Sequence, residues 1–130
     1  MRAVARAVSV PALVGLLVTC LAACGGGAGG DQDVIDQLRA AGADLSQPRD
    51  VRYYLYVPDE TGARQVAADV SAAGRAVSVE PAAVGSDWLV LVSETVVVDL
   101  ATMQARAAEF GEAVERFGGE YDGWEAAASP

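Results

Sequence analysis

The sequence contains no histidine and no lysine, and these two absences exclude many kinds of enzyme. Without histidine there is no Ser-His-Asp triad and no Cys-His pair, and without lysine no Schiff base can form. A set of His and Cys ligands for zinc is also lacking. No glycine-rich loop lies between a strand and a helix, so no phosphate cradle is visible. We therefore expect a protein that is not an enzyme and that needs no cofactor or metal.

Carboxylates are the catalytic groups that remain. Glu109, Glu112 and Glu115 share one expected helix, and paired carboxylates serve glycosidases. The more ordinary interpretation is a solvated helix surface, which we prefer. In the same way, Asp59 and Glu60 suit the start of a helix better than a metal site.

A short basic and apolar segment opens the chain. Two arginines precede an uncharged apolar run from Ala7 to Leu21, which is shorter than the roughly 20 residues of a transmembrane helix. The run closes with Leu21-Ala22-Ala23-Cys24, the pattern of a lipobox, in which small residues precede a cysteine that accepts lipid. The sequence predicts a signal peptide over residues 1–23, followed by acyl chains such as palmitate on Cys24. The protein would be lipid-anchored to the extracytoplasmic face of the cell membrane.

Cysteine is scarce and the charge is strongly negative. Cys20 would leave with the signal peptide, so the domain would hold no disulfide and would depend on its own core. The 18 acidic residues outnumber nine arginines, which gives a net charge of −9. Such a surface repels nucleic acid and anionic lipid headgroups. We expect no nucleic-acid partner, a membrane contact made through lipid, and a protein partner, for which a basic surface is the natural complement.

The rest of the chain divides into a tether, one domain and a tail. The glycine-rich residues 24–30 are typical of a flexible tether. Residues 31–125 have the patterning of a folded domain, and residues 126–130 are expected to fray.

Hydrophobic periodicity predicts an α+β domain with three helices and four strands. Three helices are expected: one over Asp33–Ala41 with Asp31 or Asp33 at its start, one capped by Asp59 or Thr61 and ended by Gly74, and one capped by Asp99 and ended by Gly118-Gly119. The four strands are expected over Val51–Val57, between the first two helices, over Ala76–Glu80 and Trp88–Val92, between the second and third helices, and over Glu120–Glu125 at the end. The segment Thr95–Val98 either prolongs a strand or forms a connection. This order fits a ferredoxin-like split βαβ sandwich, with helices on one face of a four-stranded antiparallel sheet and an extra N-terminal helix.

Five residues are candidates for contact with a partner, namely Tyr54, Tyr56, Tyr121, Asp122 and Trp124. Tyr54 and Tyr56 lie on the strand face opposite the core, which is an open contact surface if helices cover only one side. Alternatively, the N-terminal helix covers them. Trp124 either takes part in the contact or closes the core, with Gly123 setting a bulge.

Four segments are recognisable, namely Asp44–Arg49, Tyr53–Pro58, Asp87–Leu91 and Gly118–Glu125, and the last is the most specific. Together they resemble the regulator of ribonuclease E activity B family. The resemblance covers nearly all of Val34–Glu125. It implies a ferredoxin-like α+β fold and a non-enzymatic protein that binds ribonuclease E and inhibits its cleavage of RNA. It brings no catalytic residues.

Export and this family role lead to two hypotheses. A lipid-anchored domain outside the membrane cannot meet ribonuclease E, which is cytoplasmic. We therefore expect a membrane-anchored lipoprotein whose ribonuclease-regulator domain binds another protein. The alternative is a cytoplasmic protein that binds and inhibits ribonuclease E because its N-terminal signal is not used.

Overall fold

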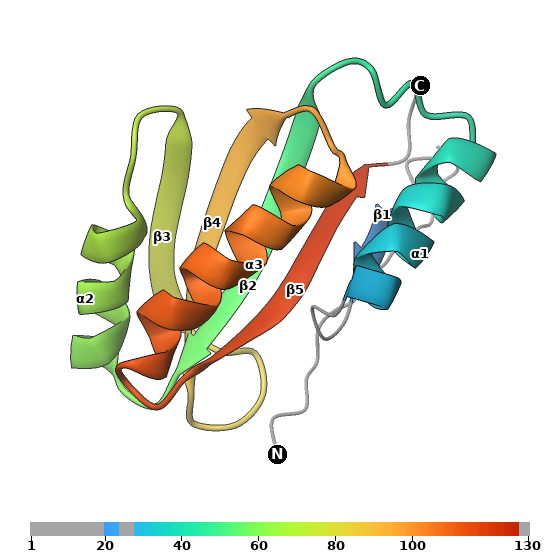
Figure 1. Cartoon of the computed structure of the whole chain (residues 1–130). Coiled ribbons are helices and arrows are strands. Elements are labelled where there is room, and N and C mark those ends of the chain that lie inside the picture. Colours follow the sequence, from blue (N-terminus) through green and yellow to red (C-terminus); the bar gives the residue numbers. More distant parts are fainter. Residues whose placement is uncertain (1–19, 24–27, 128–130) are drawn as a thin grey trace.

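The computed structural model describes residues 20–23 and 28–127 (Figure 1). These residues form a five-stranded antiparallel sheet in the order β1-β5-β2-β4-β3. The elements are β1 (Cys20–Ala23), α1 (Ala28–Ala40), β2 (Arg49–Val57), α2 (Glu60–Val70), β3 (Arg75–Pro81), β4 (Trp88–Val96), α3 (Leu100–Glu115) and β5 (Glu120–Ala127). The three helices lie side by side on one face of the sheet, with α3 in the middle (Figure 1).

Strands β2 to β5 and helices α2 and α3 make the split βαβ unit. Strand β2 is central and pairs with β4 on one side and β5 on the other. Its residues alternate, with Val51, Tyr53, Leu55 and Val57 buried under the helices. The α+β, ferredoxin-like prediction is therefore confirmed, including the extra helix α1 before these four strands, whereas the fifth strand, β1, was not predicted.

The core is built around three large rings. The Tyr53 ring lies 4.9 Å from the Phe110 ring of α3, and the Phe110 ring lies 5.9 Å from that of Tyr121, measured between centroids. Trp124 is 1 % exposed beside them. Burial of side chains this large contributes about 1.5–3 kcal/mol each, so these contacts hold α3 against β2 and β5.

Two aspartates fix where α2 and α3 begin. The Asp59 carboxylate accepts a 2.8 Å hydrogen bond from the Gly62 amide, and the Asp99 carboxylate accepts one of the same length from the Thr102 amide. Each such cap stabilises a helix by about 1 kcal/mol. The expected caps are thus confirmed, with Asp59 rather than Thr61 at the start of α2.

Helix α3 ends where the backbone turns back toward β2. Gly118 has φ +72°, and the Gly119 amide donates to the Val114 carbonyl at 2.9 Å. A Cβ on Gly119 would lie 2.6 Å from Val57 Cγ1 and would overlap the Tyr56 carbonyl. Only glycine fits there, so this pair of glycines closes α3 and sets the start of β5.

The N-terminal boundary differs from the prediction. Residues 20–23, which we assigned to the signal peptide, form β1 and pair with β5 from Cys20 opposite Ala127 to Ala23 opposite Trp124. The outer edge of β5 presents backbone donors and acceptors that an extended neighbouring segment can pair with. Helix α1 begins at Ala28, so the last three residues assigned to the tether are helical.

The C-terminal boundary also differs, because β5 continues to Ala127. Ala126, which we placed in the frayed tail, is 2 % exposed and pairs with Val51. The Arg49 guanidinium donates to the Ala127 carbonyl at 2.6 Å and holds this end in place. Strand β4 runs to Val96, so Thr95 and Val96 prolong the strand.

Most of the predicted signal peptide, residues 1–19, and the predicted lipid site, Cys24, lie outside the described residues, as do residues 128–130. Within the described part of the chain, every helix is too short or too polar to cross a membrane.

Candidate functional site

The sheet has two chemically different faces, and the five candidate residues divide between them. Tyr53 lies opposite both Val92 and Trp124, so these three share the face under the helices. Tyr54 lies opposite Leu91 and therefore points to the other side. The candidates do not form one surface.

The side of the sheet away from the helices centres on Tyr54 and Tyr56 of β2 and on Leu89 and Leu91 of β4, and we call it the tyrosine face. Tyr56 lies opposite Leu89, just as Tyr54 lies opposite Leu91. Helix α1 packs against β1 and α3, so it does not cover the two tyrosines. Among the described helices none lies on the tyrosine face (Figure 1).

Tyr54 is held in place by a small polar group. Its hydroxyl donates a 2.7 Å hydrogen bond to Glu125 Oε2, and Arg52 Nη1 lies 3.7 Å from the same oxygen. Glu125 is only 8 % exposed. Burial, followed by the hydrogen bond to Glu125, raises the pKa of the Tyr54 hydroxyl. Tyr54 is therefore a fixed, neutral side chain on this face.

Trp124 takes the core position that we gave as its alternative. Its Nε1 donates a 2.9 Å hydrogen bond to Asp31 Oδ1, and both residues are 1 % exposed. Burial raises the pKa of Asp31, and the bond from Trp124 opposes that shift. The expected bulge is confirmed, because the β2–β5 register shifts between Tyr53 and Leu55 and Gly123 has φ +109°.

Tyr121 and Asp122 flank this bulge. Tyr121 lies opposite Leu55 and packs against Phe110 under the helices, where burial raises the pKa of its hydroxyl. Asp122 is half-buried. A partner-binding role for the five candidates stays a prediction, and the position of Tyr54 and Tyr56 on the side of the sheet away from the described helices favours that role for these two.

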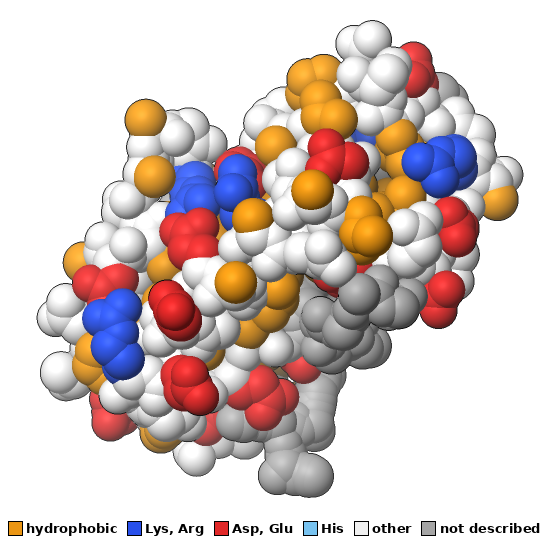
Figure 2. Space-filling model, viewed as in Figure 1, with side chains coloured by type: hydrophobic (Ala, Val, Ile, Leu, Met, Phe, Trp, Pro, Cys, Tyr) orange, Lys and Arg blue, Asp and Glu red, His pale blue; other side chains and the backbone are white. Residues whose placement is uncertain are grey.

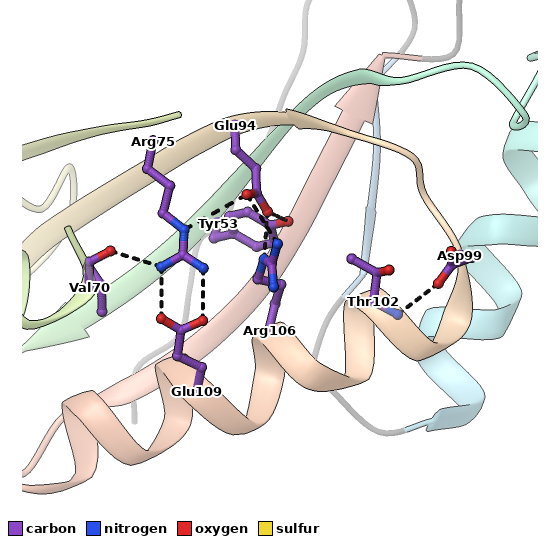
Figure 3. Close-up of polar contacts among 8 residues, drawn as sticks. All are labelled: Tyr53, Val70, Arg75, Glu94, Asp99, Thr102, Arg106 and Glu109. Atoms are coloured by element: carbon purple, nitrogen blue, oxygen red, sulfur yellow. Dashed lines mark hydrogen bonds and ion pairs between the residues drawn. The ribbon is translucent and has the colours of Figure 1, made fainter. Parts of the chain in front are cut away.

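A buried ionic network was missed by sequence reasoning (Figure 3). Glu94 Oε2 accepts hydrogen bonds of 2.6 Å from the Tyr53 hydroxyl and from Arg106 Nε. The Arg75 guanidinium meets Glu109 through two bonds of 2.7 and 2.8 Å, and its Nε lies 3.8 Å from Glu94 Oε1. The side chains of Arg75 and Glu94 are 8 % and 9 % exposed. A signal did exist, because Glu94 continues the inward alternation of Val90 and Val92.

The contacts within the network favour the ionised form of its carboxylates. Burial opposes ionisation of Glu94, but the bonds from Arg106 and Tyr53 outweigh it and lower the pKa of Glu94. The pKa of Glu109 is lowered chiefly by Arg75. A carboxylate tied to guanidinium groups is a poor proton donor near neutral pH, so the arrangement is suited to joining β4, β3 and α3.

The helix side of the molecule carries mixed charge. Figure 2 shows acidic side chains beside arginines over α2 and α3. Glu112 and Glu115 are exposed, in agreement with a solvated helix surface, whereas Glu109 is bound to Arg75. In the part of the chain that the structure describes, no cluster of three or more His, Cys, Asp or Glu side chains suits a metal ion.

Comparison with known proteins gives one family. A family model described as regulator of ribonuclease activity B matches residues 30–126. A search of curated proteins gives no match. The matched range spans α1 to β5 and contains the whole described hydrophobic core, from Val34 to Ala126. Because the match covers most of the chain and all of its core, the chain belongs to the regulator of ribonuclease activity B family.

Proposed function

We propose that this chain is a non-enzymatic regulator that acts by binding a protein. The family match over residues 30–126 is the observation that carries the proposal, because it covers the domain from α1 to β5. Tyr54, which Glu125 holds on a sheet face without a described helix, fits a contact role better than a chemical one. The carboxylates of the buried network are bound to arginines, which also suits a structural role.

We further propose that lipid on Cys24 holds the domain at the extracytoplasmic face of the cell membrane. Cleavage before Cys24 would remove β1 and leave all the described core residues, which begin at Val34. Three residues, 25–27, would separate Cys24 from the first residue of α1, Ala28. The four steps from Cys24 to Ala28 span at most about 14 Å when extended, so the domain would sit directly at the bilayer surface.

Mass spectrometry of the N-terminus, on protein expressed from its own start codon, tests the anchor. We expect a chain that begins at a diacylated or triacylated Cys24 and that partitions with membranes. The matched Cys24→Ser variant should lose the acyl mass and leave the membrane fraction. An unmodified chain that retains Met1 and stays in the soluble fraction would contradict the anchoring proposal.

A second candidate is a cytoplasmic regulator that binds ribonuclease E and inhibits it. The family description, which names regulation of ribonuclease activity, favours this role. Cleavage of a fluorescent RNA by purified ribonuclease E, with increasing amounts of the full chain, separates the candidates. Dose-dependent inhibition together with an unprocessed N-terminus supports the cytoplasmic role, and unchanged cleavage removes it.

A further inference from the structure

Strand β3 is the last strand of the sheet, so one of its edges pairs with no described strand (Figure 1). It pairs with β4 from Arg75 opposite Glu94 to Pro81 opposite Trp88, without a bulge. Proteins usually protect such an edge with charges, prolines or bulges, because its free backbone groups can pair with another chain. The middle of β3, residues 76–79, has none of these three features. This edge therefore lacks the usual protection.

A hydrogen bond at the end of β3 shows which backbone groups point outward. The Ala82 amide donates to the Asp87 carbonyl at 2.9 Å, and these two residues continue the β3–β4 register by one pair beyond Pro81. Successive residues of an antiparallel strand direct their backbone groups alternately to one neighbour and to the other. Because Ala82 is directed toward β4, the amides and carbonyls of Val77 and Val79 are directed away from it.

Two residues limit the length of this free edge. The Arg75 backbone is also directed outward, but its amide already donates to the Ala72 carbonyl at 3.1 Å. Pro81 is directed outward as well and has no amide hydrogen, which is the position that proline normally takes in an edge strand. Both observations agree with the outward direction of Val77 and Val79. Within the described part of β3, these two valines supply the amides that can bind an added strand.

The side chains beside this edge are exposed on one side and apolar on the other. Ala76, Ser78 and Glu80 are exposed and lie on the side of the sheet away from the helices. Val77 and Val79 lie on the helix side, where they are half-buried and pack against the core. An added strand would therefore extend the apolar helix side with every second residue and place its other residues beside short, polar or acidic side chains.

Charge distinguishes between two possible occupants of the edge. A second copy of this chain could pair its own β3 here, but each chain has a net charge of −9, and two such chains repel each other. Glu80 is exposed, and its carboxylate meets no arginine among the described residues. An opposite charge on a neighbouring strand stabilises the pairing, whereas a like charge destabilises it. The edge therefore favours a basic segment of a different protein over a second copy.

We propose that the free edge of β3 binds an extended, basic segment of a partner protein as an added antiparallel strand. The backbone of Val77 and Val79 supplies the hydrogen bonds, apolar side chains of the segment continue the helix side, and a Lys or Arg lies beside Glu80. This inference rests on the proposed function in so far as it names a surface through which the chain binds a protein. It holds for either cellular location.

The test uses the full chain with Cys20→Ser and Cys24→Ser and a synthetic peptide of eight residues. The peptide alternates threonine and valine and has an arginine at each end, one of which can lie beside Glu80. We expect the amides of Val77 and Val79 to exchange at least about tenfold more slowly when the peptide is bound, as measured by hydrogen exchange and NMR. The amides of the alternate residues, which already pair with β4, should change little.

Three control peptides separate backbone pairing from general attraction. N-methylation of the valines, which lie opposite Val77 and Val79 and donate to β3, should weaken binding at least about fivefold, because each lost hydrogen bond contributes to affinity. N-methylation of the threonines, whose amides face away from β3, should leave binding unchanged. Glutamates in place of the arginines should weaken binding at least about threefold, because an exposed ion pair is lost.

Matched variants of the chain test the same edge from the other side. Val79→Pro removes one outward amide and leaves the hydrogen bonds to β4, so it should weaken binding of the peptide at least about fivefold. Ser78→Thr, which changes an exposed neighbouring side chain, should leave binding unchanged. Glu80→Gln should weaken binding about threefold, whereas Glu112→Gln on the helix side should not. If Val79→Pro does not fold, the methylated peptides still decide the question on the unchanged chain.

Four results would overturn the proposal. Unchanged exchange of the Val77 and Val79 amides at millimolar peptide shows that the edge does not accept a strand. Equal binding of the valine-methylated peptide shows a contact that does not use backbone pairing, and equal binding of the glutamate peptide shows that the edge does not select a basic segment. A concentration-dependent dimer that Val79→Pro abolishes assigns the edge to a second copy. Each result differs from a failure of lipidation or of ribonuclease inhibition, because neither of those measurements uses the peptide.

Discussion

Tyr53 of β2 and Glu94 of β4 are joined by a 2.6 Å hydrogen bond from the tyrosine hydroxyl to the carboxylate oxygen that also accepts from Arg106. The bond links the aromatic core to an ionic network that reaches α3 and β3 (Figure 3). The Arg75 guanidinium carbon lies 5.1 Å from the centroid of the Phe110 ring, so the same cation touches the core and the network. Glu94 accepts hydrogen bonds from both Tyr53 and Arg106, and its negative charge balances the positive charges of Arg106 and Arg75.

Glu94→Gln is expected to destabilise the domain by about 2–4 kcal/mol, because it leaves the Arg106 and Arg75 charges partly buried with less compensation. The amide keeps the shape of the carboxylate, so the loss measures charge more than packing. Urea unfolding followed by tryptophan fluorescence gives the change in unfolding free energy. The control is Glu112→Gln on the exposed side of α3, which should change stability by less than about 0.5 kcal/mol. Equal effects of the two substitutions would contradict a stabilising network.

Asp31 should make stability depend on pH in the direction opposite to Glu94. Burial raises the pKa of Asp31 in the folded state, so its contribution is present below the usual aspartate pKa of about 3.9 and is lost as pH rises through the raised value. Asp31→Asn keeps an oxygen to accept from Trp124 and cannot ionise. We therefore expect the variant to melt at a higher temperature than the original chain at pH 7, and the two to converge near pH 3.5.

Thermal melts at half-unit steps between pH 3.5 and pH 7.5 measure this difference. The pKa of Glu94 and that of Glu109 are lowered, so both proteins should lose stability together as pH falls through those lowered values. That shared acid limb serves as an internal control. Parallel curves for Asp31→Asn and the original chain over the whole range would show that Asp31 carries no buried charge.

The regular elements followed from local patterns, because each depends on residues close in sequence. Asp59 and Asp99 mark helix starts through their own carboxylates, and the alternation along β2 marks its inward side. The division of the candidates between two faces could not be predicted in full, because the position of Trp124 depends on a helix 93 residues away. The Arg75–Glu109 contact similarly joins residues 34 apart. The pattern of a single sequence does not indicate which distant residues will pair.

The boundaries of the domain were less predictable for a related reason. Ala126 looks like any small tail residue, and only its pairing with Val51 and the hold of Arg49 on Ala127 make it part of the core. The residues of β1 match the end of a signal peptide by composition. They also pair with β5, which would otherwise have unpaired backbone groups along that edge. Composition alone does not choose between these two uses.

Gly119→Ala is expected to destabilise the domain by about 2–3 kcal/mol, because the added Cβ would overlap the Tyr56 carbonyl and crowd Val57. Gly111→Ala is the matched control. Nothing lies within 4 Å of a Cβ at Gly111, and alanine in a helix interior should stabilise α3 by about 0.5–1 kcal/mol. Urea unfolding of both variants checks the opposite signs. A stable Gly119→Ala protein would show that β5 does not approach β2 this closely after α3.

Removal of residues 1–23 should expose one edge of β5 and leave the core intact. Strand β1 pairs with Trp124–Ala127, while the opposite edge of β5 pairs with β2. In a chain that begins at residue 24 with Cys24→Ser, the β5 amides directed toward β1 should exchange at least about tenfold faster than in the full chain. Those directed toward β2 should keep their protection, since alternate residues of a strand pair with opposite neighbours. Hydrogen exchange followed by NMR, residue by residue, distinguishes the two sets. Unchanged exchange along the whole of β5 would mean that β1 does not hold this edge in solution, and a general loss of protection would mean that the core needs the leader.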